Sequence, residues 1–239
     1  MVASSGGIVI LINAEAEWQV ALGFYRVKNI DPGPYASFKQ SIGATDRIQQ
    51  VVFVYGGSGK IAAASASQFA IDHWNPNLLV NVGTCGGFEG DVIEGEVILA
   101  ERTSVYDICE RSGGQQNMER RFTTDTKLPW QIPPYPKNTK PGIIVSADRD
   151  LDPAEIPGLR ERYGAIAADW ESASVAYVVQ TVNKVDCLIL RAVSDVVGHA
   201  GSPIYGSNIV FEDRVRRVMP PLLEALPDWL RMAGYRWLE

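Results

Sequence analysis

Short, continuous apolar runs recur along the chain and are separated by stretches of mixed polarity. Such runs, rich in β-branched residues and bounded by glycine or proline, are typical of strands buried on both faces of a sheet. They predict strands at residues 7–12, 50–55, 78–82, 96–100, 142–146, 164–167 and 187–193.

The stretches between these runs predict helices at residues 15–25, 60–73 and 171–182. The C-terminal region from Asn208 is also predicted to be helical. Prolines lack a backbone donor and clash with the preceding turn. We therefore expect breaks in this last helix at Pro220, Pro221 and Pro227.

Residues 111–140 are polar and contain several prolines and glycines, so they are predicted to form a long surface loop. Elsewhere strands alternate with helices, which implies a mostly parallel or mixed sheet with helices on both faces. A chain of 239 residues is long enough for one such domain. We assign residues 1–239 to a single α/β domain.

Composition narrows the classes of partner. The net charge of −6 argues against a nucleic-acid-binding or anionic-membrane surface, but not against a nucleoside, which carries no phosphate. Three cysteines without a CxxC pair indicate a reducing compartment, and we expect the cytoplasm. Two histidines are too few for a His-rich metal site, and no metal or cofactor is predicted.

The apolar run at residues 8–12 is too short to span a bilayer. Glu15 and Glu17 follow it at once, and a signal peptide would not carry acids there. We therefore expect neither a membrane segment nor a secretion signal.

Acidic residues stand at predicted strand ends and helix starts within apolar sequence. Buried charges are costly without a partner or a task, and open α/β sheets place ligand sites at such strand ends. Asp195 ends a predicted strand, and Glu171 begins a helix that Asp169 could cap. Glu15 or Glu17 could each stabilise the N-terminus of the predicted helix through its dipole, but one acid is enough for that purpose.

Strand alternation places Arg191, Val193 and Asp195 on one face. The arginine and the aspartate could form a structural ion pair, or the aspartate could be an acid tuned for catalysis. The residues alone leave both interpretations open.

Two glycine-rich turns follow predicted strands. Gly56-Gly-Ser-Gly-Lys60 is not a P-loop, because Val54 and Ile61 stand where glycine and Ser/Thr are required. Gly83-Thr-Cys-Gly-Gly87 is not a dinucleotide motif, yet its glycines either form a tight turn or let the backbone approach a ligand. We count Gly86 among the candidate binding residues. Its neighbour Cys85 has no adjacent base or cation and is interpreted as a buried filler.

These segments, in this order, resemble the purine nucleoside phosphorylase and nucleosidase superfamily, above all its plant-type 5′-methylthioadenosine/S-adenosylhomocysteine nucleosidases. The likeness spans roughly residues 8–195. It is carried by residues 8–22, 56–64, 81–87, 169–171 and 191–195. The resemblance implies one α/β domain with a mixed, partly closed sheet flanked by helices. It also implies a small-molecule nucleoside as substrate and a homodimer.

The resemblance also implies roles for single residues. Asp195 matches the acid that protonates the purine at N7, and Glu17 matches the base that activates water. Glu171 matches the carboxylate that holds the ribose hydroxyls. Thr84 matches a small hydroxyl residue near the sugar, and Arg191 matches an arginine near the catalytic aspartate. Glycosidic cleavage needs one protonated and one ionised acid, so the environments of the two must differ.

The chain departs from the family pattern around the substrate pocket. Trp170 replaces a methionine. Residues 146–151 stand where many members carry an aromatic, but they look more like the Gly-Asp-Ser-Leu-Asp segment of the plant-type branch, so Asp148 is a candidate binding residue. Residues 196–210 form a longer loop than usual, and Phe211 is assigned to the pocket wall. The substrate's 5′ end is therefore the least specified part of the site.

Two alternatives stand beside the nucleosidase. Phosphorylases of this superfamily place arginines in the first-strand loop and before the glycine turn, because phosphate needs cationic or N–H donors. In this chain the first-strand loop is residues 13–17, which include Glu17, and Asn81 precedes the glycine turn. An acid in place of an arginine repels phosphate, so this pattern favours water as the nucleophile. A non-enzymatic relative would have signalled itself by loss of Glu17 or Asp195.

Overall fold

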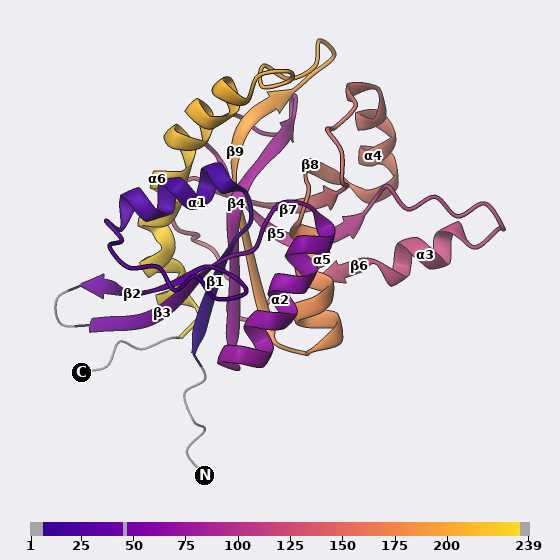
Figure 1. The fold of residues 1–239 in the computed structure, drawn as a ribbon. Coiled ribbons are helices and arrows are strands. Elements are labelled where there is room, and N and C mark those ends of the chain that lie inside the picture. Colours follow the sequence, from indigo (N-terminus) through magenta and orange to yellow (C-terminus); the bar gives the residue numbers. More distant parts are fainter. Residues whose placement is uncertain (1–6, 45–46, 235–239) are drawn as a thin grey trace.

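Across residues 7–44 and 47–234, which the computed structural model describes, one nine-stranded mixed sheet forms the centre of the molecule (Figure 1). Its strands are β1 (Ile8–Ile12), β2 (Ser37–Ala44), β3 (Arg47–Tyr55), β4 (Leu78–Phe88), β5 (Val97–Val105), β6 (Thr123–Asp125), β7 (Thr139–Ser146), β8 (Ala165–Asp169) and β9 (Asp186–Val197).

Helices cover both faces of this sheet. They are α1 (Glu15–Phe24), α2 (Lys60–Trp74), α3 (Gln115–Arg121), α4 (Ile156–Tyr163), α5 (Ser172–Ala176) and α6 (Asn208–Met232), with a π-helical turn, η2 (Tyr177–Val182), continuing α5 and a 3₁₀ turn, η1 (Pro153–Glu155), preceding α4. One apolar cluster joins α1 and α6 to the sheet, and a second joins α2 and α5 to its other face.

Five strands close into a ring. β4 pairs with β9, β9 with β5, β5 with β7, β7 with β8, and β8 returns to β4. The strands β1, β3 and β2 extend the sheet from β4 as an open wing. The predicted fold class, a mixed and partly closed sheet flanked by helices, is confirmed.

The parallel strands β1, β4 and β9 end at one edge of the sheet, which is where ligand sites of such sheets lie. The pairing of β4 with β9 is interrupted by a bulge. Cys85 pairs with Val193 and Gly86 with Asp195, which leaves Ser194 as the extra residue. A bulge reverses the side-chain alternation beyond it.

All seven predicted strands are present, and β4, β5 and β9 are longer than their apolar runs. The prediction of residues 111–140 as a loop was wrong in part, because they contain α3, β6 and the start of β7. The edge strand β2 and the short helix α4 were not predicted. In β2 the polar residues outnumber the buried Phe38 and Ile42, so an apolar run is absent from the sequence there.

Helix α6 corrects the expectation that its prolines break it, since it runs unbroken through all three. Its inner face buries nine side chains against the sheet, among them Leu222, Leu226 and Trp229. This burial offsets the backbone hydrogen bonds that the prolines remove. Neither α6 nor any other helix of the described residues is both long and apolar enough to cross a membrane.

Candidate active site

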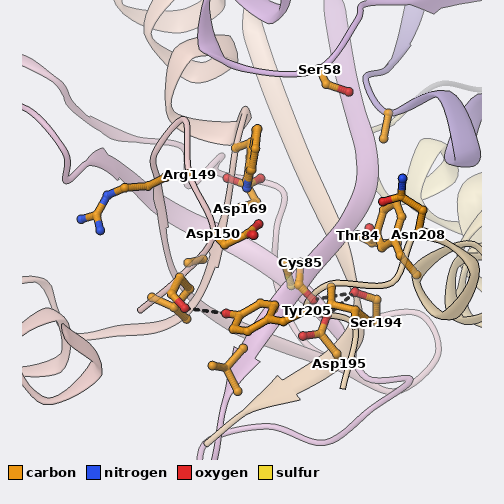
Figure 2. A pocket seen from close by; sticks show the side chains of 18 of the residues that line it. Ser58, Thr84, Cys85, Arg149, Asp150, Asp169, Ser194, Asp195, Tyr205 and Asn208 are labelled. Carbon is orange, nitrogen blue, oxygen red and sulfur yellow. Dashed lines mark hydrogen bonds between the residues drawn. The ribbon is translucent and has the colours of Figure 1, made fainter. Parts of the chain in front are cut away.

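A cavity of about 610 Å³ opens at the sheet edge where β4, β8 and β9 end (Figure 2). Its volume is that of a small-molecule site. Seven of the residues predicted from the sequence line it: Glu17, Thr84, Gly86, Trp170, Glu171, Asp195 and Phe211. The structure thus brings together residues from five separate segments of the chain.

Glu17 lies in the first turn of α1, and its carboxylate is buried against β4. Its Oε1 accepts hydrogen bonds from the Thr84 amide at 2.6 Å and the Thr84 hydroxyl at 2.8 Å. A Cβ at Gly83 would stand 2.8 Å from Oε2, so only glycine leaves room for this carboxylate. Burial raises the pKa of Glu17, and the positive charge of Arg191 opposes that rise.

The neighbouring acid points elsewhere. Glu15 is exposed and accepts a hydrogen bond from Gln19 on the outer face of α1. Residues two positions apart in a helix, such as Glu15 and Glu17, are separated by about 200° around its axis. One of the two acids therefore faces the cavity and the other faces solvent. Of the two acids, Glu17 lines the cavity and Glu15 does not.

Asp195 also lines the cavity, just past the bulge in β9, with 1% of its surface exposed. Its Oδ1 accepts from the Ser194 hydroxyl at 2.7 Å, and its Oδ2 accepts from the Ser202 hydroxyl. Burial raises the pKa of Asp195, although both serine hydroxyls act in the opposite direction. The carboxyl group therefore keeps its proton to a higher pH than an exposed aspartate.

The structure does not place Arg191 and Asp195 on one face, as strand alternation predicted, because the bulge at Ser194 intervenes. Arg191 is buried behind the cavity. Its Nε donates to Asp169 Oδ2 at 2.7 Å, and Nη2 donates to Asn81 Oδ1 at 2.5 Å. The ion-pair interpretation of Arg191 was thus right in kind but wrong in its partner.

Loss of the buried ion pair should destabilise the protein. Asp169→Asn leaves the Arg191 charge buried without its counter-ion, and breaking such a pair costs about 3–5 kcal/mol. Asp125→Asn is the matched control, because Asp125 pairs with Arg102 at the surface, where a pair contributes about 0–1 kcal/mol. Denaturant unfolding of the two variants checks this, and equal losses would contradict it.

Glu171 immediately precedes α5 and reaches back across the cavity wall. Its Oε1 accepts a hydrogen bond at 2.8 Å from the amide of Gly59, a residue with φ of 88°. Burial, and next the negative charge of Asp169, raise the pKa of Glu171. Asp169 accepts the amide of Ser172, the first residue of α5, although Glu171 and not Asp169 occupies the N-cap position of this helix.

Asp148 does not line this cavity. Its Oδ1 accepts the amide of Lys60 at 2.7 Å, which caps the first turn of α2. A Cβ at Gly59 would stand 3.1 Å from the same oxygen. Asp148 therefore holds the turn whose glycine amide binds Glu171.

Several lining residues were not predicted, notably Asp150, Tyr205, Ser207 and Asn208. In Figure 2 the Asp150 carboxylate points into the cavity, whereas the neighbouring Arg149 turns outward, where it pairs with Glu155. Their positions depend on the conformations of two irregular connections, one after β7 and one between β9 and α6. Hydrophobic periodicity in the sequence does not predict such conformations.

The sequence pattern of the phosphorylase superfamily matches residues 8–225. The chain belongs to the phosphorylase superfamily. This membership confirms the resemblance drawn from the sequence motifs and agrees with the closed five-strand ring.

Several individual proteins are similar to this chain over most of its length. A 5′-methylthioadenosine/S-adenosylhomocysteine nucleosidase of Buchnera aphidicola is 25% identical over 235 residues, which cover 93% of this chain and 98% of that protein. The apo structure of an Arabidopsis thaliana 5′-methylthioadenosine nucleosidase gives a TM-score of 0.76 at 19% identity, covering 97% of each chain. Futalosine hydrolase of Helicobacter pylori gives 0.71 at 17% identity, covering 96% of this chain and 97% of the other.

The cavity of this superfamily member is acidic. Among the described residues that line it, Arg149 is the sole cationic side chain, against the acids Glu17, Asp150, Asp169, Glu171 and Asp195. Asn81, where a phosphorylase would place an arginine, is buried and donates to Leu11 and Asn13. In residues 7–44 and 47–234, no group of three or more His, Cys, Asp or Glu side chains is arranged to hold a metal ion.

Proposed function

We propose that this chain is a purine nucleosidase that hydrolyses the N-glycosidic bond of 5′-methylthioadenosine or S-adenosylhomocysteine. The observation that carries the proposal is Glu17, a buried carboxylate held by Thr84 where phosphate would need a cation. The nucleosidase relative that spans nearly the whole chain supports the same activity.

The two buried acids divide the chemistry. Water attacks the anomeric carbon and gives its proton to Glu17, while the C–N bond breaks and its electron pair goes to the purine. Asp195 supplies a proton to N7 of the leaving base. A general acid and a general base on opposite faces of the sugar suit the oxocarbenium-like transition state of this reaction. Free base and free pentose are the products.

Other residues bind or position the substrate in this proposal. Glu171 accepts the ribose hydroxyls, and Trp170, which is 39% exposed in the cavity wall, packs beside the sugar. Phe211 and Gly86 form apolar walls. Two residues act from behind the cavity: Arg191 supports the ionised form of Glu17, and Asp148 holds the Gly59 turn.

A nucleoside panel assayed with and without phosphate tests the proposal against the phosphorylase alternative. The nucleosidase releases free pentose at one rate in both conditions. Pentose 1-phosphate as the main product would establish the phosphorylase instead, and no turnover of any purine nucleoside would point to a non-enzymatic relative.

Glu171→Gln should lower kcat more than it weakens binding of the base. The glutamine keeps an oxygen for the Gly59 amide but cannot ionise, whereas the ionised form of Glu171 makes stronger bonds to both ribose hydroxyls. The variant should therefore discriminate less than the wild type between ribosyl and 2′-deoxyribosyl substrates. Ratios of kcat/KM for the two sugars check this, and an unchanged ratio would remove Glu171 from ribose recognition.

We also propose that the protein forms a homodimer in the cytoplasm, as the family resemblance implies. A largely apolar groove of about 280 Å³ between α2 and η2 supports a second copy as its occupant, because Ile61 beside it is 85% exposed. Light scattering tests the dimer, and a mass of one 26.2 kDa chain would exclude it.

A further inference from the structure

Residues 198–206 connect β9 to α6 at the cavity. They begin with a backbone bridge in which Gly198 and Gly201 exchange hydrogen bonds of 3.2 and 2.9 Å. Gly201 and Gly206 have φ of 94° and 76°, which glycine adopts without strain. Ile204, Tyr205 and Gly206 line the cavity directly. This segment is called the strap below.

The strap reaches the Asp195 carboxylate through Ser202. The Ser202 hydroxyl accepts a hydrogen bond from the Ile204 amide at 3.3 Å and donates to Asp195 Oδ2. A hydroxyl has one proton, and here that proton is directed at the carboxylate by a turn within the strap.

Ser194, the second donor to this carboxylate, is differently placed. Its hydroxyl lies within hydrogen-bonding distance of both Asp195 Oδ1, at 2.7 Å, and the Cys85 carbonyl, at 3.2 Å. Its single proton is therefore divided between two acceptors. Ser202 is the donor that serves Asp195 alone.

Tyr205 fixes the strap from the other side of the cavity. Its hydroxyl donates to the Leu151 carbonyl in the loop between β7 and α4 (Figure 2). The strap is thus tied at Asp195 on β9 and at Leu151 on the facing wall. The bond at Leu151 limits how far Ser202 can move from Asp195.

We propose that Ser202 is a positioning residue that orients the Asp195 carboxyl group for proton transfer and stabilises the carboxylate left after transfer, with Tyr205 holding the strap in place. This inference rests on the proposed role of Asp195 as the general acid. A hydrogen bond to an ionised group is stronger than one to its neutral form, so Ser202 favours the state that follows proton release.

Other charged and titratable groups near Asp195 also affect its pKa and so the pH dependence of the rate. Arg214 on α6 donates to the Ser194 carbonyl and favours the ionised form of Asp195, whereas Glu94 opposes it. Tyr205 and Cys85 also interact electrostatically with this carboxylate, and burial raises the pKa of the phenol and of the thiol. Neither Tyr205 nor Cys85 therefore titrates near neutral pH.

Ser202→Ala provides the test. Activity requires protonated Asp195, so kcat/KM falls as pH rises through the pKa of this carboxyl. Loss of the Ser202 donor raises that pKa, and the alkaline limb of the kcat/KM profile for 5′-methylthioadenosine should move up by about one pH unit. At the wild-type optimum, kcat should fall by about tenfold. Ser202→Thr, which keeps the hydroxyl, should restore the profile.

Ser67→Ala is the matched control, because Ser67 donates to the Ala63 carbonyl within α2, away from the cavity. It should leave the alkaline limb where it is in the wild type. An unmoved or lowered limb in Ser202→Ala, with Asp195→Asn inactive, would overturn the inference alone. Substantial activity in Asp195→Asn would overturn the proposed acid itself.

A double-mutant cycle tests the part of Tyr205. If Tyr205 acts by holding Ser202, Tyr205→Phe should move the alkaline limb in the same direction, and the pair should shift it by less than the sum of the single variants. Additive shifts would show that Tyr205 acts independently of Ser202.

Discussion

Replacement of Asp195 by asparagine is expected to lower kcat by about 10²–10⁴-fold, the usual contribution of a general acid. An amide has no proton to deliver to N7 of the departing purine. The side chain keeps its size, and its oxygen can still accept from Ser194 or Ser202. Steady-state hydrolysis of 5′-methylthioadenosine measures the loss, with thermal unfolding as the check that the variant is folded.

The wild-type pH profile tests the same assignment from another direction. Because burial raises the pKa of Asp195, the acid should remain protonated to higher pH than an exposed aspartate. The rate should fall as pH rises through this value, since the reactive form is the protonated one. Asp213→Asn, at an exposed pair with Arg217 on α6, is the control and should keep wild-type kcat. A folded Asp195→Asn variant with near wild-type activity would remove Asp195 from the mechanism.

The second large effect is expected from Glu17→Gln, which should bind purine nucleosides but hydrolyse them at least 10²-fold more slowly. A carboxylate at this position can take a proton from the attacking water, whereas an amide cannot. The buried amide must also fit the donors of Ala14 and Thr84, which previously faced acceptor oxygens. Binding of a nucleoside by calorimetry, together with single-turnover hydrolysis, separates the chemical defect from a folding defect.

Glu15→Gln is a close control for this variant. Glu15 lies two residues away in the same helical turn, but on the solvent face, where it contacts Gln19. Its substitution should change kcat by less than about twofold, as expected for a surface position outside the cavity. Full activity in Glu17→Gln, or equal losses in the two variants, would reject Glu17 as the base that activates water.

The strands could be predicted because buried strands leave continuous apolar runs. Local sequence marked Glu17 and Asp195 only as acids at a helix start and a strand end, and the family resemblance was needed to single them out. The partner of Arg191 could not be predicted in this way. The bulge at Ser194 that turns Asp195 away from Arg191 arises from pairing between β4 and β9, and no apolar period records it.

Tertiary burial explains the other departures from the sequence prediction. The prolines of α6 carry a strong local breaking signal, yet the apolar face of that helix is held against the sheet. Ser202 carries no signal at all. Its contact with Asp195 depends on how the strap folds back over the strand end. Gly201 and Gly206 allow that path but do not predict it.

The closed ring of β4, β9, β5, β7 and β8 separates the placement of the reacting groups from the shape of the loops that contact the substrate. Thr84, which binds Glu17, and Asp195 stand on neighbouring strands of this ring, each paired along both edges near the site. The spacing between Asp195 and Thr84, to which Glu17 is bonded, is therefore set by the backbone ladder. The strap and the loop at Asp150 lie outside the ladder, so their length and chemistry can change while the reacting groups keep their places. The same sheet can thus accept a different nucleoside when the sequences of the strap and of the loop at Asp150 change.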